Sequence, residues 1–199
     1  MSTSTIALNG LILAGGSSSR MQSDKGSLPY HGMPQYQYLY NLLLPFCQQV
    51  FISGRKEIDY SLPTLHDKIE YENYGPLAGV LTAFDQFSSA WLIVAVDYPL
   101  FREKEINHLV KERDNTYDST VYFDYEKQFF EPFLGIYEPN LLQFIKLHAE
   151  RFRYSSQKIL QQGMVKKIIA PQAHSLLNIN TKDGYDEFII SPSTSDESI

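Results

Sequence analysis

The stretch Leu11–Met21 reads LILAGGSSSRM, an apolar run followed by a loop of glycine and serine. The apolar part has the length of a short buried strand, and the two glycines that end it allow a sharp turn because they lack a Cβ. Pro34 then stands where the first turn of a helix would begin, and apolar side chains recur after it at helical spacing. Strand, glycine-rich loop and helix in this order predict the first unit of an α/β fold.

The same alternation of strand-length apolar runs and helical periods continues along the chain. Further strands are expected at 50–52, 91–96, 120–123, 133–137 and 166–170, and helices at 36–44, 76–87, 102–113, 141–151, 156–162 and 182–189. The run at 91–96 is the most apolar and predicts a central strand that is buried on both faces.

This order of elements predicts a single-domain, three-layer α/β/α fold with a mostly parallel, Rossmann-like sheet. We expect the domain to occupy residues 1–190. Residues 191–199 are rich in serine and threonine and are expected to form a flexible C-terminal tail. In folds of this class ligands bind beyond the carboxyl ends of the strands, so the residues that follow each strand are the candidates for function.

The composition is that of an ordinary globular protein and excludes several classes of function. Of the 199 residues 43% are hydrophobic, and 17 Lys and Arg against 23 Asp and Glu leave a net charge of −6, which argues against a general nucleic-acid binder. A single cysteine, Cys47, excludes an internal disulfide scaffold. No run approaches the about 20 apolar residues of a membrane span, and the N-terminus lacks the basic start of a secretory signal. We therefore expect a cytoplasmic protein without nucleic-acid or membrane partners.

The loop after the first strand has the composition of a phosphate-binding loop. Gly15 and Gly16 let the backbone come close to a ligand, and backbone N–H groups that point the same way bind phosphate oxygens. Arg20 offers a bidentate guanidinium and Lys25 a point charge, and both suit phosphates. The spacing matches neither a Walker A loop, nor the G-x-G-x-x-G fingerprint, nor a G-x-S-x-G nucleophile elbow. A plain Gly/Ser surface loop with solvated charges is the alternative interpretation.

Four segments in order resemble motifs of the molybdenum cofactor guanylyltransferases, a nucleotidyltransferase family. They are LAGG with the RM and DK pairs at 13–25, GPLAG at 75–79, DYP at 97–99 and NINT at 178–181. The resemblance covers about residues 6 to 188. It implies the fold of the nucleotide-diphospho-sugar transferases, and transfer of GMP from GTP to molybdopterin with Mg²⁺ and release of pyrophosphate. It also implies molybdenum cofactor insertion proteins as partners.

The resemblance also implies roles for individual residues on the nucleotide side. Asp97 would be the Mg²⁺ ligand, Lys25 would neutralise charge near the α-phosphate, and Arg20 would hold the pyrophosphate end. The implied nucleotide-binding residues are Leu13, Ala14, Gly15, Gly16, Lys25, Asp67, Gly75, Gly79 and Asp97. Structural alternatives stand beside these roles. Asp97 could cap the next helix, Lys25 and Arg20 could be solvated surface charges, and the GPLAG segment could be a proline that starts a helix. Asp67 could be a turn residue.

On the acceptor side the resemblance points to Asn178, Asn180 and Pro132. The two asparagines are two residues apart, so in a strand they would share one face. An Asx turn before a helix that begins near Thr181 is the alternative.

The sequence departs from the family pattern at three places. Gln22 stands where the family usually has glycine, Gly54 takes the place of an asparagine, and the pair at 182–183 is Lys-Asp instead of Pro-Glu or Pro-Asp. The first two departures concern nucleotide recognition and leave the selectivity for GTP open. Two further hypotheses therefore stand: a nucleotidyltransferase with another nucleotide or acceptor, such as CTP or a sugar phosphate, and a non-catalytic nucleotide-binding module.

Overall fold

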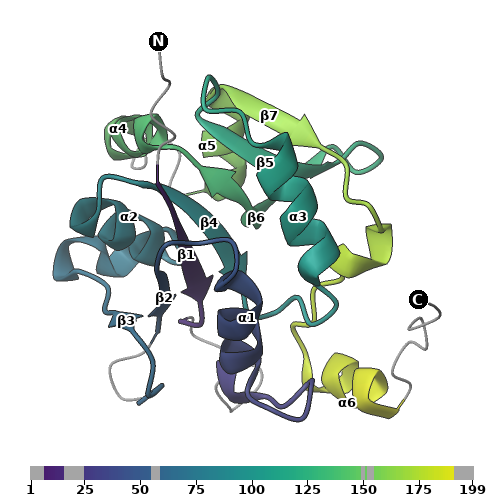
Figure 1. Cartoon of the computed structure of the whole chain (residues 1–199). Helices are drawn as coiled ribbons and strands as arrows, with labels where there is room; N and C mark the ends of the chain where they lie inside the picture. Colours follow the sequence, from purple (N-terminus) through teal and green to yellow (C-terminus); the bar gives the residue numbers. More distant parts are fainter. Residues whose placement is uncertain (1–6, 16–24, 55–58, 149–150, 152–154, 191–199) are drawn as a thin grey trace.

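The computed structural model describes residues 7–15, 25–54, 59–148, 151 and 155–190. Seven strands form one sheet in the order β3-β2-β1-β4-β6-β5-β7. Helices α1 and α3 cover one face of the sheet, and α2, α4 and α5 cover the other (Figure 1). The predicted three-layer α/β/α architecture is therefore confirmed for the described part of the chain.

The elements have the following bounds. The strands are β1 Leu8–Leu13, β2 Val50–Ser53, β3 Thr64–Leu65, β4 Ala90–Ala95, β5 Ser119–Asp124, β6 Phe129–Tyr137 and β7 Val165–Ile168. The α-helices are α1 Gln35–Leu43, α2 Leu77–Gln86, α3 Glu103–Glu112, α4 Pro139–His148, α5 Ser156–Gln162 and α6 Lys182–Ile190. Three 3₁₀ helices are η1 Lys25–Ser27, η2 Ile69–Tyr74 and η3 Ala173–Leu176.

The sheet is mostly parallel, as predicted. Strand β1 pairs in parallel with both β2 and β4, and β3 and β7 also join the sheet in parallel. Strand β6 is the exception, because it runs antiparallel to both of its neighbours, β4 and β5. Every residue of β1 and of β4 is buried, which confirms that 91–96 forms part of a central strand.

Two features of the sheet differ from the expectation. The two-residue strand β3 was not predicted, because two residues carry no measurable periodicity. Strand β6 begins at Phe129 instead of 133 and so includes Pro132, where the pairing with β5 shifts from Val121↔Gly135 to Phe123↔Phe130. A proline has no N–H to give to a ladder, and such an irregularity is where a strand accommodates one.

The carboxyl ends of β1, β2 and β4 meet at one edge of the sheet. Leu13 pairs with both Ser53 and Ala95, so the loops that follow these three strands start side by side. Helix α6 lies beyond this edge, near α1 (Figure 1). The tail expected at 191–199 lies outside the described residues.

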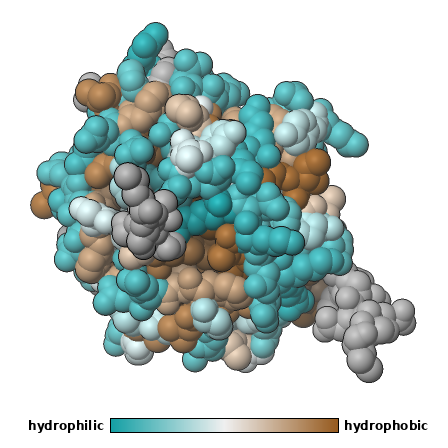
Figure 2. Space-filling view, turned by 45° about the horizontal axis from the view of Figure 1, so that its top comes forward, coloured by the Kyte–Doolittle hydropathy of each residue, from teal (hydrophilic) through white to brown (hydrophobic). Residues whose placement is uncertain are grey.

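Length and apolarity decide whether a helix in the described part of the chain could span a membrane. None of the helices there is both long and apolar enough to cross a bilayer. Figure 2 shows mainly hydrophilic residues on the face that it draws, with hydrophobic residues gathered in smaller patches.

Candidate functional site at the carboxyl edge of the sheet

The first loop begins with two residues that are bound to the neighbouring strand. The N–H groups of Ala14 and Gly15 donate to the carbonyl oxygen of Ser53, at 2.8 and 3.0 Å. These two N–H groups cannot bind phosphate as expected, because both already donate to Ser53 inside the fold. Gly16, Arg20 and Gln22 lie outside the described residues, and so does the side chain of Lys25.

A small pocket opens beside the end of β2. It has a volume of about 260 Å³ and is lined by Gly54, Asp67, Lys68, Ile69 and Glu72. The Ser53 hydroxyl donates to Oδ1 of Asp67 at 3.1 Å, so Asp67 is joined to the strand end instead of standing in an isolated turn.

The two glycines of the GPLAG segment serve different purposes in the structure. Gly75 has φ +57°, a backbone conformation that favours glycine, and a Cβ there would meet no atom within 4 Å. Gly79 lies in α2, where a Cβ would be only 2.1 Å from Oγ of Ser53. Gly75 is therefore required by the turn before α2, whereas Gly79 is required by the packing of α2 against β2.

Asp97 follows the buried strand β4 and is held by a segment that lies far away in sequence. Nδ2 of Asn178 donates to Oδ2 of Asp97 at 2.8 Å, and the N–H of Ile179 donates to the Asp97 carbonyl at 2.8 Å. The alternative that Asp97 caps the next helix is not what the structure has, because α3 begins at Glu103 with Arg102 as its N-cap.

A second carboxylate lies near Asp97 and was missed in the sequence. The hydroxyl of Tyr98 donates to Oε2 of Glu131 at 2.8 Å. Burial raises the pKa of Glu131, and the negative charges of Asp97 and Asp124 raise it further. Burial also raises the pKa of Tyr98, and the negative charges of Asp97 and Glu131 raise it further. The only signal in the sequence was that Glu131 precedes Pro132, a residue already singled out.

Pro132 itself is buried in the irregular part of β6. Its carbonyl oxygen accepts a hydrogen bond from the hydroxyl of Tyr137. Pro132 therefore belongs to the irregular part of β6. It does not line the pocket at Asp67 or the larger pocket described below.

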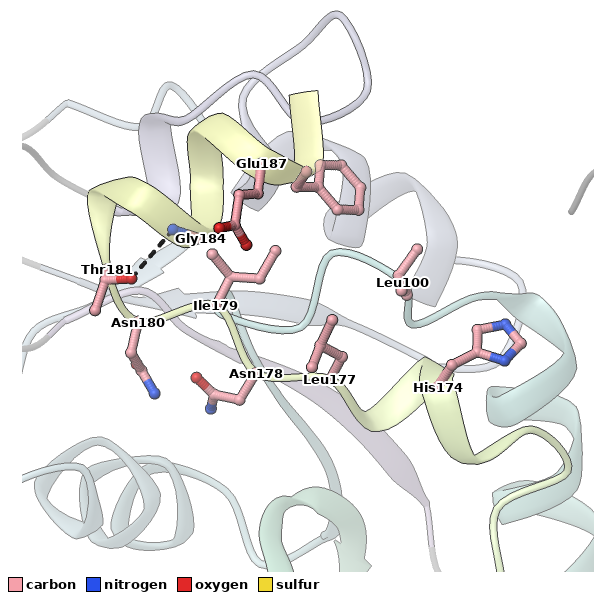
Figure 3. Close-up of a pocket in the computed structure, with 10 residues that line it drawn as sticks. Leu100, His174, Leu177, Asn178, Ile179, Asn180, Thr181, Gly184 and Glu187 are labelled. Atoms are coloured by element: carbon pink, nitrogen blue, oxygen red, sulfur yellow. Dashed lines mark hydrogen bonds between the residues drawn. The ribbon is translucent and has the colours of Figure 1, made fainter. Parts of the chain in front are cut away.

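The NINT segment forms a loop and the start of a helix, and no strand. Asn178 is half-buried, Ile179 is buried and Asn180 is exposed, and in Figure 3 both asparagine side chains lie on the opposite side of this loop from Ile179. The hydroxyl of Thr181 accepts from the N–H of Gly184 at 3.2 Å and so caps α6. Oδ1 of Asn178 is buried, and none of the residues that the structure describes forms a hydrogen bond with it.

A larger pocket lies between this loop, α6 and the segment after Asp97 (Figure 3). Its volume is about 570 Å³. The lining residues are Leu100, His174, Leu177, Asn178, Ile179, Asn180, Thr181, Gly184, Glu187 and Phe188. In Figure 3 the carboxylate of Glu187 reaches from α6 toward the loop that carries Ile179. The lining thus combines apolar side chains, such as Leu177 and Phe188, with polar ones, such as Asn178 and Glu187, and sites for small molecules typically combine both kinds.

Aromatic contacts join the residues after η1 to both Asp97 and α6. The ring of Tyr30 packs edge-on against Tyr185 and Phe188, with centroids 5.0 and 5.4 Å apart. Nε2 of His31 lies 2.9 Å from the carbonyl oxygen of Pro99. Burial raises the pKa of Tyr30, as do the nearby Tyr185 and Asp97. These contacts bring the backbone that begins at Lys25 to the same edge of the sheet as Asp97.

The described residues do not contain a ready-made cage for a metal ion. No group of three or more His, Cys, Asp or Glu side chains in the described ranges is arranged to hold one. The candidate site therefore offers the Asp97 carboxylate next to the Asn178 amide, with the Glu131 carboxylate nearby, and an ion bound there would need further ligands from a substrate or water. Mg²⁺ is commonly bound in this way, by one or two carboxylates together with phosphate oxygens and water.

Comparison with known proteins gives consistent matches over most of the chain. The model of the MobA-like NTP transferase domain matches residues 10–168. A molybdenum cofactor biosynthesis bifunctional protein from Synechocystis is 33% identical over 90% of this chain, although the chain spans only 53% of that protein. A probable molybdenum cofactor guanylyltransferase from Flavobacterium johnsoniae is 30% identical, with 92% of this chain and 97% of that protein aligned.

Solved structures share the fold. Molybdopterin-guanine dinucleotide biosynthesis protein A from Archaeoglobus fulgidus superposes with a TM-score of 0.74 at 21% identity, covering 92% of this chain and 99% of that one. A 2-C-methyl-D-erythritol 4-phosphate cytidylyltransferase from Thermus thermophilus superposes with a TM-score of 0.64 at 13% identity, covering 92% and 96%. The fold is therefore that of nucleotidyltransferases.

Proposed function

This chain belongs to the family of MobA-like NTP transferases, and we propose that it transfers GMP from GTP to molybdopterin, with Mg²⁺ as cofactor and with release of pyrophosphate. The names of two relatives that align with most of this chain support the choice of reaction. The observation that carries it is the contact between Asp97 and Asn178, because it joins the expected metal ligand to the expected acceptor side at one edge of the sheet.

On the nucleotide side the guanine would bind at the pocket that contains Asp67. Guanine presents two adjacent N–H donors, and a carboxylate accepts from such a pair. Asp67 lines a pocket at the end of β2, next to the loop that follows β1. From there the phosphates would extend past Gly15 and Gly16 toward Asp97.

The residues at the phosphates would act through charge and position. Asp97 fits a Mg²⁺ site because its carboxylate is a hard oxygen ligand and is oriented by the Asn178 amide. When bound, Mg²⁺ would supply charge neutralisation on the phosphates. Lys25 would neutralise charge at the α-phosphate and Arg20 at the departing pyrophosphate. These roles match a reaction in which catalysis comes mainly from positioning and electrostatics.

On the acceptor side molybdopterin would occupy the pocket beside Asn178 and Asn180. A volume of about 570 Å³ lies in the range of sites for small ligands, and its apolar walls suit a flat ring system. The acceptor's terminal phosphate oxygen would attack the α-phosphorus of GTP. The bond from that phosphorus to the bridging oxygen of the β-phosphate would break, and pyrophosphate would leave.

One observation favours the second candidate, a transferase with another nucleotide. A Cβ at Gly54 would be 2.4 Å from the ring of Tyr60, so the space for a side chain at this position is already filled. Residue 54 therefore cannot supply the contact to the nucleotide that the family's asparagine would make at this position.

The first test is thermal stabilisation by GTP, ATP, CTP and UTP, each with and without Mg²⁺. A ligand that binds only the native state at a hundredfold excess over its Kd adds about 2.7 kcal/mol of stability. We expect selective stabilisation by GTP, and pyrophosphate release from GTP only when molybdopterin is added. Stabilisation by another nucleotide supports the second candidate. Nucleotide binding without pyrophosphate release in the presence of molybdopterin supports a non-catalytic module.

A further inference from the structure

Ser53 connects three parts of the nucleotide side. Its carbonyl oxygen accepts the N–H groups of Ala14 and Gly15, and its hydroxyl donates to Asp67. Its side chain also packs against Gly79, where any Cβ would collide with it. Ser53 is 4% exposed, so it touches these groups from inside the fold and does not face solvent.

We propose that Ser53 is a positioning residue for guanine selectivity, which acts by fixing the orientation of the Asp67 carboxylate. The inference rests on the proposed function, because it assumes that Asp67 binds the guanine edge. Two parallel hydrogen bonds to guanine require the plane of the carboxylate to match the plane of the base. A donor at 3.1 Å from one carboxylate oxygen restricts its rotation to such an orientation before the nucleotide arrives.

The surroundings of Ser53 explain why this residue carries the task. Position 54 has no side chain, and the Tyr60 ring leaves no room for one. Lys68 follows Asp67 directly, and its backbone N–H donates to the Thr82 hydroxyl at 3.1 Å, which ties the segment after Asp67 to α2. The backbone next to Asp67 is thus held by α2, and the Ser53 hydroxyl acts on the carboxylate itself.

Ser53→Ala separates the side-chain role from the backbone role. The variant keeps the carbonyl oxygen that binds Ala14 and Gly15, and it removes only the hydroxyl. We expect the affinity for GTP to fall about tenfold, because a hydrogen bond to a charged group is lost. At saturating GTP, kcat should change less than about twofold while KM rises, since the effect concerns ground-state and transition-state binding equally.

The specific readout is discrimination between GTP and ITP, which lacks the 2-amino group. The wild-type protein is expected to bind GTP about tenfold more tightly than ITP, and in Ser53→Ala this ratio should fall to about threefold or less. Adding Asp67→Asn to Ser53→Ala should not lower the ratio below that of Asp67→Asn alone, because both changes remove the same recognition.

Ser89→Ala is the matched control. Ser89 is also a buried serine, and its Oγ accepts from Nδ2 of Asn9 at 2.9 Å, but it lies just before β4, at the opposite edge of the sheet. This variant should lose stability without changing the GTP to ITP ratio. If Ser53→Ala does not fold, Ser53→Cys, which keeps a somewhat larger side chain with a much weaker donor at this position, should show the same fall in the ratio.

The outcomes separate the two proposals. A Ser53→Ala protein that retains the wild-type GTP to ITP ratio overturns the role of Ser53, even if its stability is lower. A wild-type protein that binds ATP as tightly as GTP overturns the guanine assignment itself, and the inference about Ser53 with it.

Discussion

The two sides of the candidate site are built in different ways. The nucleotide side consists of the residues that directly follow β1 and β2, together with Asp67 and the start of α2, and it is held largely by backbone groups and glycines. The acceptor side is built by side chains from distant parts of the chain. The hydrogen bond from Asn178 to Asp97 spans 81 residues, and that from Tyr98 to Glu131 spans 33.

Because of this difference, the two sides should tolerate amino-acid substitutions differently. A site made from consecutive strand ends needs small residues at fixed spacings, so a substitution there disturbs packing as well as binding. A site made from side chains that meet in space can lose one contact while the fold persists. Substitutions on the two sides should therefore have different signatures in activity and in stability.

The largest effect is expected where the two sides meet, at Asp97. We expect Asp97→Asn to lower turnover at least about a thousandfold, because the proposed Mg²⁺ ligand loses its negative charge and the ion that neutralises the phosphates is bound less tightly. The fold should persist, since the Asp97 carbonyl still accepts from Ile179. Pyrophosphate release in the presence of GTP, Mg²⁺ and molybdopterin measures the first effect and circular dichroism the second. Turnover within tenfold of wild type would contradict the assignment of Asp97.

On the acceptor side, Asn178→Ala should lower turnover by about ten- to a hundredfold. The amide orients the Asp97 carboxylate and lines the acceptor pocket, so its loss affects the geometry of the reaction and not the nucleotide pocket. The affinity for GTP alone should stay within about twofold of wild type, as measured by titration calorimetry. A larger loss of GTP affinity than of turnover would remove the distinction between the two sides.

The nucleotide side is tested by the two glycines of the GPLAG segment. Gly79→Ala places a methyl group 2.1 Å from Oγ of Ser53 and should cost about 1–3 kcal/mol of stability together with GTP affinity. Gly75→Ala meets no neighbouring atom, but the backbone at φ +57° and ψ −139° strongly favours glycine, so this change should also cost about 1–3 kcal/mol of stability while it leaves the contact with Ser53 intact. Urea unfolding and GTP titration of both variants provide the measurement. A Gly79→Ala protein with the stability and the GTP affinity of wild type would show that steric packing at Gly79 is unimportant.

The smallest effect is expected at Asp85, which links α2 to the rest of the molecule. Its carboxylate binds Nζ of Lys68 at 2.7 Å, Nζ of Lys146 at 2.5 Å and the hydroxyl of Tyr71 at 2.8 Å. Burial alone would raise the pKa of Asp85, but the hydrogen bonds from Lys146, Lys68 and Tyr71 outweigh it and lower the pKa to about 2.

A lowered folded-state pKa means that Asp85 stabilises the protein fully above its ordinary pKa near 3.8, and that this contribution is lost as the pH falls toward 2. Asp85→Asn should therefore cost about 1 kcal/mol at pH 7, and the difference from wild type should shrink below pH 4. Urea unfolding of both proteins between pH 7 and pH 3 measures it. A difference that grows toward low pH would have the wrong sign for this explanation.

Much of the fold and part of the site could be predicted from single residues and their spacing. Alternation of apolar runs and helical periods located every strand of the described ranges except β3, and the position of Asp97 after the most apolar run placed it at the ligand-binding edge. These predictions succeed because burial of a strand and the turn after it depend on residues that are adjacent in sequence.

Other parts of the site could not be predicted in this way. Ser53 follows the strand that was expected at 50–52, and nothing near it in the sequence indicates Asp67 or Gly79 as its contacts. Glu131 could be recognised as part of the site only from the structure, where β6 brings it within hydrogen-bond distance of Tyr98. A strand and a turn before the helix both stayed open for the two asparagines, because a spacing of two residues does not distinguish a strand from a loop, and the structure has a loop there.

The sequence by itself determined the α/β class, the order of elements and the edge of the sheet at which function should reside, because these follow from local hydrophobic pattern and chain order. Only the tertiary structure decided which side chains meet there. Ser53 holds Asp67 because the ends of the parallel strands β2 and β3 converge in space, and Asp97 faces Asn178 because the loop before α6 is bound to the segment that follows β4. The pairing of those side chains depends on register and on packing between layers, and neither property is written in any short segment.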